Sequence, residues 1–214
     1  MKTISIGTQS SAAELVTAFA NALAAEIGWT AEKDADGNLT GNVKKSGIDV
    51  FFRFFVYGSY VRLTVSNGYL VADTYASKNF SASSTYHLWV LESANGSVAV
   101  GFEAPSYTPY LSVLIARNSA GVYVGMSCSS STIHTVRGVD TESRKISLSA
   151  NYTAGVSTSI VKMPDIWGDA MFVDLYYVVS CPFQSTDRVF YIGGKNYRSI
   201  GTNSSYMYFA LPEE

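Results

Sequence analysis

One amphipathic helix near the amino terminus constrains this chain more than any other feature. In the stretch SSAAELVTAFANALAAEIGWT, residues 10–30, Ser11 is followed three residues later by Glu14, which is the spacing of a capping box. Gly28 comes directly after the apolar pattern, where glycine readily adopts the left-handed conformation that ends a helix. Apolar side chains recur at spacings of three and four and form one stripe: Ala12, Leu15, Val16, Phe19, Leu23 and Ile27. The pattern predicts a helix over residues 11–27 that packs this stripe against a sheet.

The opposite face of this helix is small rather than charged. Alanine is a good helix former, so this face is either solvated in a chain that uses few charges or covered by a second layer or another subunit. The second reading makes four residues a candidate interface: Ala13, Thr17, Asn21 and Ala24.

Almost all of the chain after the helix reads as strands and turns. Residues 48–57, IDVFFRFFVY, are apolar on both faces apart from two charges and indicate a central strand. Residues 60–66 alternate polar and apolar side chains, as a strand with one buried face does, and Gly58-Ser59 predicts a tight hairpin before them. Asn95-Gly96 predicts another hairpin, because Asn-Gly is the strongest hairpin dipeptide. The predicted fold class is α+β, mostly β, with one N-terminal amphipathic helix packed on antiparallel β-sheets in a meander or a sandwich.

No linker rich in Pro, Gly or Ser divides the chain, so we expect a single β-rich domain over residues 1–214. Residues 129–155 are more polar, and any sub-boundary is expected there. We interpret this stretch as a surface excursion with one or two short strands, in which His134 is solvent-exposed. Residues 1–9 are weakly patterned and indicate an extended lead-in.

The composition argues against several classes of partner. Charged residues make up 15% of the chain, against about 25% in typical soluble proteins. The formal net charge is −2 and no basic run is present, so we expect no nucleic-acid partner. No apolar run approaches the ~18 residues of a membrane span. Gln9, Glu14 and Asn21 interrupt the apolar core that a signal peptide needs, so we expect no signal peptide.

Catalytic and metal-binding chemistry has little basis in the sequence. The chain has two histidines and no G-x-S-x-G elbow. Cys128 and Cys181 are too few for a disulfide scaffold or a structural zinc site, and they leave open two buried free thiols or one long-range bridge. A glycoside hydrolase would need two facing carboxylates, and the candidates are Glu92, Glu103, Asp165, Asp169 and Asp174. We therefore expect no enzymatic activity, no cofactor and no metal, with a glycoside hydrolase as a remote alternative.

Aromatic residues in turn regions are better candidates for recognition. Tyr107 and Tyr110 flank a Thr-Pro dipeptide, and Trp167 lies between Pro164 and Gly168. Rings on loops can stack on sugars or anchor a protein interface, although they can equally cap the ends of a core. These three residues are the candidate ligand contacts of an alternative function, a carbohydrate- or receptor-binding β module that recognises a host surface glycan.

Stretches from the start, middle and end of the chain resemble tail-associated virion proteins encoded by bacteriophages and prophages. They are SAAELVTAFANALAAEIGWT, YHLWVLESANGSVAVGFEAP, PYLSVLIARNSAGVYVGM and FYIGGKNYRSIGTNSSYMYFALPEE. In that family a helix ending in Gly-Trp-Thr leads into a β-rich body. The resemblance implies a non-enzymatic structural protein of the virion tail, made in the bacterial cytoplasm, that self-assembles and contacts other tail proteins. It implies no catalytic residue.

Overall fold

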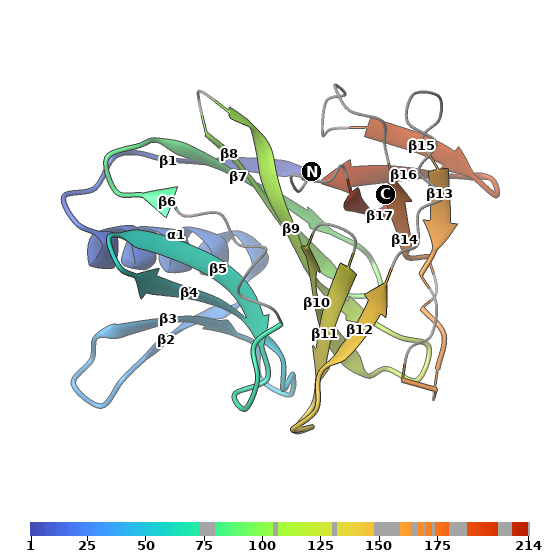
Figure 1. Cartoon of the computed structure of the whole chain (residues 1–214), viewed down its shortest axis with the longest axis horizontal. Helices are drawn as coiled ribbons and strands as arrows, with labels where there is room; N and C mark the ends of the chain where they lie inside the picture. The colour runs from blue at the N-terminus through green and yellow to red at the C-terminus, as the bar shows by residue number, and fades with distance from the viewer. Residues whose placement is uncertain are drawn as a thin grey trace.

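The computed structural model arranges the chain as three antiparallel sheets in layers, with a helix between two of them (Figure 1). The structure describes residues 1–72, 80–104, 107–129, 132–147, 159–163, 167–168, 170–172, 174–179, 188–200 and 207–213. The predicted fold class, α+β and mostly β with antiparallel sheets, is confirmed.

Each sheet is built largely from strands that follow one another in the chain. The N-terminal sheet has the order β2-β3-β4-β5-β6, with β2 (Thr30–Lys33), β3 (Leu39–Lys44), β4 (Phe51–Tyr57), β5 (Tyr60–Ser66) and β6 (Phe80–Ser81). The central sheet has the order β1-β7-β8-β9-β10-β11-β12, with β1 (Lys2–Ile6), β7 (Tyr86–Glu92), β8 (Val98–Ala104), β9 (Tyr107–Arg117), β10 (Tyr123–Ser129), β11 (Thr132–Arg137) and β12 (Arg144–Ser147). The C-terminal sheet has the order β13-β14-β17-β16-β15, with β13 (Ser159–Lys162), β14 (Tyr176–Val179), β15 (Arg188–Ile192), β16 (Lys195–Ile200) and β17 (Met207–Pro212).

The helix α1 (Ala12–Ile27) begins and ends where its capping residues predict. Ser11 is extended, and its Oγ accepts the Glu14 backbone N–H at 3.2 Å. The Glu14 carboxylate accepts the Ser10 backbone N–H at 3.1 Å, so the side chain satisfies a second donor at this end. At the other end Gly28 has a φ of 65°, and the Ala24 carbonyl accepts the Trp29 N–H at 3.0 Å. These contacts fix the length of the helix.

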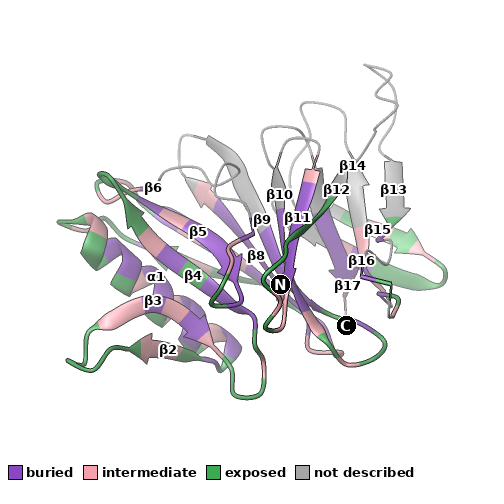
Figure 2. Cartoon of the chain, turned by 60° about the horizontal axis from the view of Figure 1, so that its bottom comes forward, coloured by how far each residue is buried: buried purple, intermediate pink, exposed green. Residues whose placement is uncertain are grey.

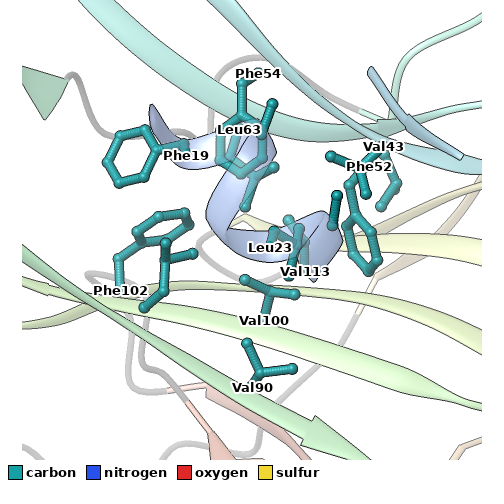
Figure 3. Packing of buried hydrophobic residues seen from close by; sticks show 14 of the residues in the cluster. Phe19, Leu23, Val43, Phe52, Phe54, Leu63, Val90, Val100, Phe102 and Val113 are labelled. Atoms are coloured by element: carbon teal, nitrogen blue, oxygen red, sulfur yellow. The ribbon is translucent and has the colours of Figure 1, made fainter. Parts of the chain in front are cut away.

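The helix α1 lies in a wedge between the N-terminal and central sheets (Figure 1). At the narrow side the sheets touch directly, because a Cβ added to Gly125 of β10 would lie 3.0 Å from the Val65 Cβ of β5. At the wide side the helix fills the gap. Its Phe19 ring lies 5.3 Å from the ring of Phe54 in one sheet and 5.3 Å from that of Phe102 in the other (Figure 3). The apolar stripe of the helix therefore joins two sheets into one core.

The inner strands β8 and β9 of the central sheet are buried on both faces. In β9, Val113 and Ile115 join the core around α1, whereas Leu114 and Ala116 join a second core shared with the C-terminal half of the chain. A strand covered on both sides has to be apolar at consecutive positions, which explains this uninterrupted run. Figure 2 shows the buried residues concentrated in the inner strands, while the turn between β2 and β3 is exposed.

Two parts of the central sheet differ from the expectations drawn from the sequence. β1 covers most of the expected lead-in and pairs with β7 from Lys2↔Val90 to Ile6↔Tyr86. The two short strands expected within residues 129–155 are β11 and β12, and residues 141–145 are exposed, but β11 is buried between β10 and β12, so the expected surface position is wrong for this strand. His134, expected to be exposed, is buried on β11. A polar strand can be buried when its ladder satisfies the backbone and another layer covers it, and periodicity alone does not reveal that cover.

Asn67 ties the N-terminal sheet to the central sheet. Its buried side-chain amide donates to the carbonyl oxygens of Asp140 at 2.7 Å and Arg137 at 3.3 Å, in the turn after β11. Its Oδ1 accepts the backbone N–H groups of Tyr69 and Leu70 in its own loop. All of the hydrogen-bonding groups of this amide are therefore used, as burial requires.

Asp174 holds the start of the C-terminal sheet against β16. Its φ of 60° is the only positive value recorded for a described residue other than glycine, and aspartate tolerates this region better than most residues. One carboxylate oxygen accepts Lys195 Nζ at 2.9 Å and the other accepts the Tyr197 hydroxyl at 2.8 Å. These two hydrogen bonds hold the pKa of Asp174 below its ordinary value.

We expect part of the thermal stability to disappear in acid because of Asp174. Its folded-state pKa lies below the ordinary value of 3.8, so the unfolded chain takes up a proton more readily than the folded chain. The stabilisation is fully present above that ordinary value and is lost as the pH falls through the folded pKa. Melting temperatures of the wild type and Asp174→Asn, measured from about pH 6 to about pH 2, should converge towards the acid end. A constant gap would contradict this role.

Candidate assembly surface

A groove of about 680 Å³ opens along the outer side of α1. Helix residues including Ala13, Val16 and Thr17 form one wall, and the start of β3 and the end of β4 form the other. The residues from β3 and the loop before it are Asn38, Leu39 and Thr40, and those from β4 are Phe54, Phe55 and Val56. The volume lies in the range of ligand-binding clefts, and the lining is mostly apolar with polar groups at its rim.

The groove exists because β3 and β4 pair over only a short length. Their ladder consists of Asn42↔Arg53 and Val43↔Phe52, whereas β4 continues to Tyr57. Gly41 interrupts the pairing with a φ of 81°, a conformation that strongly favours glycine. On the far side of this glycine β3 and β4 form no further pair, and Phe54, Phe55 and Val56 of β4 line the groove together with the helix.

The predicted interface on α1 is partly correct in its placement. Ala13, Thr17 and Asn21 are exposed, and the first two line the groove. Ala24 is only 6% exposed and belongs to the core, so its assignment to the open face is wrong. The helix is covered by two sheets rather than one, which buries a wider arc of its circumference than the single stripe predicts. Whether the exposed residues contact another chain stays a prediction.

The groove carries little charge. Glu14 is the only ionisable side chain among its lining residues. The hydrogen bonds to Ser10 lower the pKa of Glu14, so this carboxylate is ionised at neutral pH. Gln9, Asn38 and Thr40 supply neutral polar groups around it. An occupant therefore meets an apolar floor, neutral hydrogen-bonding groups and one negative charge.

The β4–β5 hairpin adds exposed apolar surface beside the groove. Val56 is 48% exposed, Tyr57 54% and Tyr60 43%. The Arg62 guanidinium lies 3.6 Å from the centroid of the Tyr57 ring and stacks on it. The sequence predicted this hairpin and a central strand over 48–57, and β4 does lie between β3 and β5, but the sequence did not indicate that the end of β4 is exposed. The signal that it missed is the separation of β3, which no local pattern of β4 contains.

Among the aromatic residues proposed for ligand contact, Trp167 alone has a described side chain. Tyr107 and Tyr110 lie on β9, and their side chains fall outside the described part of the chain. Trp167 is 8% exposed and packs in the second core, with Arg137 4.5 Å and Arg144 4.7 Å from its ring centroid. Trp167 is thus covered, and its selection as a stacking surface is wrong. Although Pro164 and Gly168 flank the Trp167 ring in sequence, the ring covers part of the second core.

The chemistry considered for an enzyme or a metal site is mostly dispersed or outside the described residues. Asp165, Asp169 and Cys181 are not described, nor is the side chain of Cys128. Asp174 is engaged by Lys195 and Tyr197. Among the described residues, His, Cys, Asp and Glu form no group of three or more that could hold a metal ion. No helix in the same residues is long and apolar enough to cross a membrane.

The groove and the hairpin beside it are therefore the best-defined candidate surface that the described residues provide. Comparison with protein-family models, curated proteins and solved structures gives no match to this chain.

Proposed function

We propose that this protein is a non-enzymatic structural protein of a bacteriophage or prophage tail that self-assembles through the groove and the open face of α1. The observation that carries the proposal is the groove itself, which is apolar, nearly uncharged and walled by the small side chains Ala13 and Thr17. Small side chains allow another chain to approach the helix closely. The sequence resemblance supplies the tail assignment.

The surroundings of the groove suit a protein interface. Stable interfaces bury about 800 Å² per partner and combine a charge-poor centre with aromatic anchors and a polar rim. Val56, Tyr57 and Tyr60 extend the apolar area next to the groove, and tyrosine is enriched among residues that dominate binding energy. Gln9, Glu14 and Asn38 provide the polar rim. Light scattering on purified protein should accordingly give a mass of at least twice the 23.1 kDa of one chain.

We expect Thr17→Lys to weaken this assembly by about tenfold or more, because it places a desolvated charge in the centre of the surface. Thr17 is exposed, so the fold should keep its melting temperature. The matched control is Thr141→Lys, at an exposed threonine in the turn before β12. Sedimentation across a range of concentrations measures both dissociation constants. A wild-type protein that stays monomeric at its highest soluble concentration would rule out self-assembly.

A further inference from the structure

The β4–β5 hairpin shows which way the backbone of β4 points. Tyr57 and Tyr60 flank the two-residue turn Gly58-Ser59, and in such hairpins the flanking pair is hydrogen-bonded. Hydrogen-bonded pairs alternate along an antiparallel ladder, so Phe55 also bonds to β5. The N–H and C=O of Val56 must then point to the opposite edge, away from β5.

An independent contact supports this orientation. A Cβ added to Gly41 would lie 2.1 Å from the carbonyl oxygen of Phe54, so that oxygen points towards β3. Phe54 and Val56 are two residues apart and direct their backbone groups to the same edge. The carbonyl of Phe54 lies against Gly41, whereas the β3–β4 ladder has no pair at the level of Val56. Val56 therefore presents one donor and one acceptor to the groove.

An unpaired strand edge inside a groove is a template for another strand. We propose that the groove binds an extended peptide segment of a partner chain, which adds to the N-terminal sheet along the free edge of β4. This inference rests on the proposed assembly function and names the form of the occupant. Main-chain hydrogen bonds give such complexes their affinity, and alternate side chains give them specificity.

The lining defines the chemistry of that segment. Side chains at every second position would face the apolar floor around Val16 and Phe54, so these positions are apolar. Small uncharged residues suit the intervening positions, because the rim offers Asn38 and Thr40 rather than charged groups. Glu14 repels an acidic residue and favours a basic one at the end of the segment that lies beside it.

The test uses the whole protein and the labelled, end-capped peptide KVTVTVT, which has the alternating pattern and a basic end. Fluorescence anisotropy should show saturable binding to the wild type. Val56→Pro removes the N–H that points into the groove and should raise the dissociation constant about tenfold, the effect of one lost hydrogen bond. The melting temperature should be retained, because this N–H has no role in the β4–β5 ladder.

Val189 offers a matched control for the proline substitution. It is 47% exposed, against 48% for Val56, and it lies on the edge strand β15. The Gly193-Gly194 turn fixes its N–H towards a free edge by the same alternation, but it does not line the groove. Val189→Pro should bind the peptide as the wild type does. Equal binding by Val56→Pro and the wild type, or equal losses in both proline variants, would overturn the inference.

A charge exchange keeps the test decisive if Val56→Pro fails to fold. The wild type should bind KVTVTVT more tightly than EVTVTVT. Glu14→Lys should reverse this order, so that EVTVTVT binds more tightly by about the factor by which the wild type prefers KVTVTVT. An unchanged preference overturns strand addition beside Glu14. If the wild type assembles and Thr17→Lys disperses it while no alternating peptide binds, the assembly proposal stands and the strand inference fails. If the peptide binds a protein that stays monomeric, self-assembly fails and the peptide site remains.

Discussion

Replacing Phe19 with alanine is expected to lower the free energy of unfolding by about 3–5 kcal/mol, the usual cost of deleting a buried phenylalanine ring. Phe19 is fully buried, and its ring lies close to four other aromatic rings. Beyond Phe54 and Phe102, its ring lies 5.6 Å from that of Tyr86 and 5.8 Å from that of Phe80. Alanine would remove a ring that packs against aromatic residues of both sheets, and the wedge cannot collapse around the cavity without moving a sheet.

Urea denaturation of the wild type and Phe19→Ala measures this loss directly. Phe19→Leu keeps most of the apolar volume and serves as the control, with an expected loss of about 1–2 kcal/mol. A loss below about 1 kcal/mol for the alanine variant would show that α1 is not held in the wedge as described. The helix would then lie on one sheet rather than between two.

Gly41→Ala is expected to destabilise the protein by about 3 kcal/mol or more, through two effects that add. The φ of 81° costs an alanine about 1 kcal/mol. The new Cβ would also lie 2.1 Å from the Phe54 carbonyl oxygen and 2.8 Å from the Val16 Cγ1, and the first of these is backbone that cannot rotate away. β3 or α1 would have to move.

Gly37 separates the two effects, since its φ of 84° is nearly the same. A Cβ added there would meet nothing within 4 Å, so Gly37→Ala should cost only about 1 kcal/mol. The difference between the two variants in urea denaturation therefore reports the close contact at Gly41 alone. Equal losses would mean that β3 does not press against β4 and α1 at this point.

The helix and most hairpins could be predicted because their determinants are local. The ends of α1 are set by a capping serine before its first turn and a glycine after its last turn, and its buried face is set by a 3.6-residue apolar period. The turns at Gly58-Ser59 and Asn95-Gly96 lie between strands whose alternation is visible in the sequence. These elements can therefore be predicted without knowing which other parts of the chain pack against them.

The incorrect predictions concern residues that are buried by other parts of the chain. Ala24 lies on the predicted open face by helical periodicity, yet a second sheet covers that arc. His134 and the polar residues around it indicate a surface segment, yet β12 pairs with β11, whose Val136 and Ile133 belong to the first and second cores. Trp167 reads as an exposed loop residue, yet two arginines cover its ring. Burial by distant chain segments leaves no local pattern.

The candidate site was predictable only in part for the same reason. Ala13 and Thr17 could be chosen from the helix because small residues on an exposed face are visible in the sequence. The groove itself depends on where β3 leaves β4, which follows from the contact of Gly41 with Phe54 and Val16. A single glycine in a strand pattern indicates an irregularity but does not reveal its direction.

The pairing of β1 with β7 has a consequence for how the chain folds as it is synthesised. Ile6 is opposite Tyr86, so the first strand waits for about eighty further residues before its partner leaves the ribosome. Until then α1 can dock on β2–β5 but not on the central sheet, and the side of Phe19 that faces Phe102 stays in water. The helix is thus made first but enclosed late, and nascent chains that end before β8 expose an apolar helix side on which chaperones or other nascent chains can act.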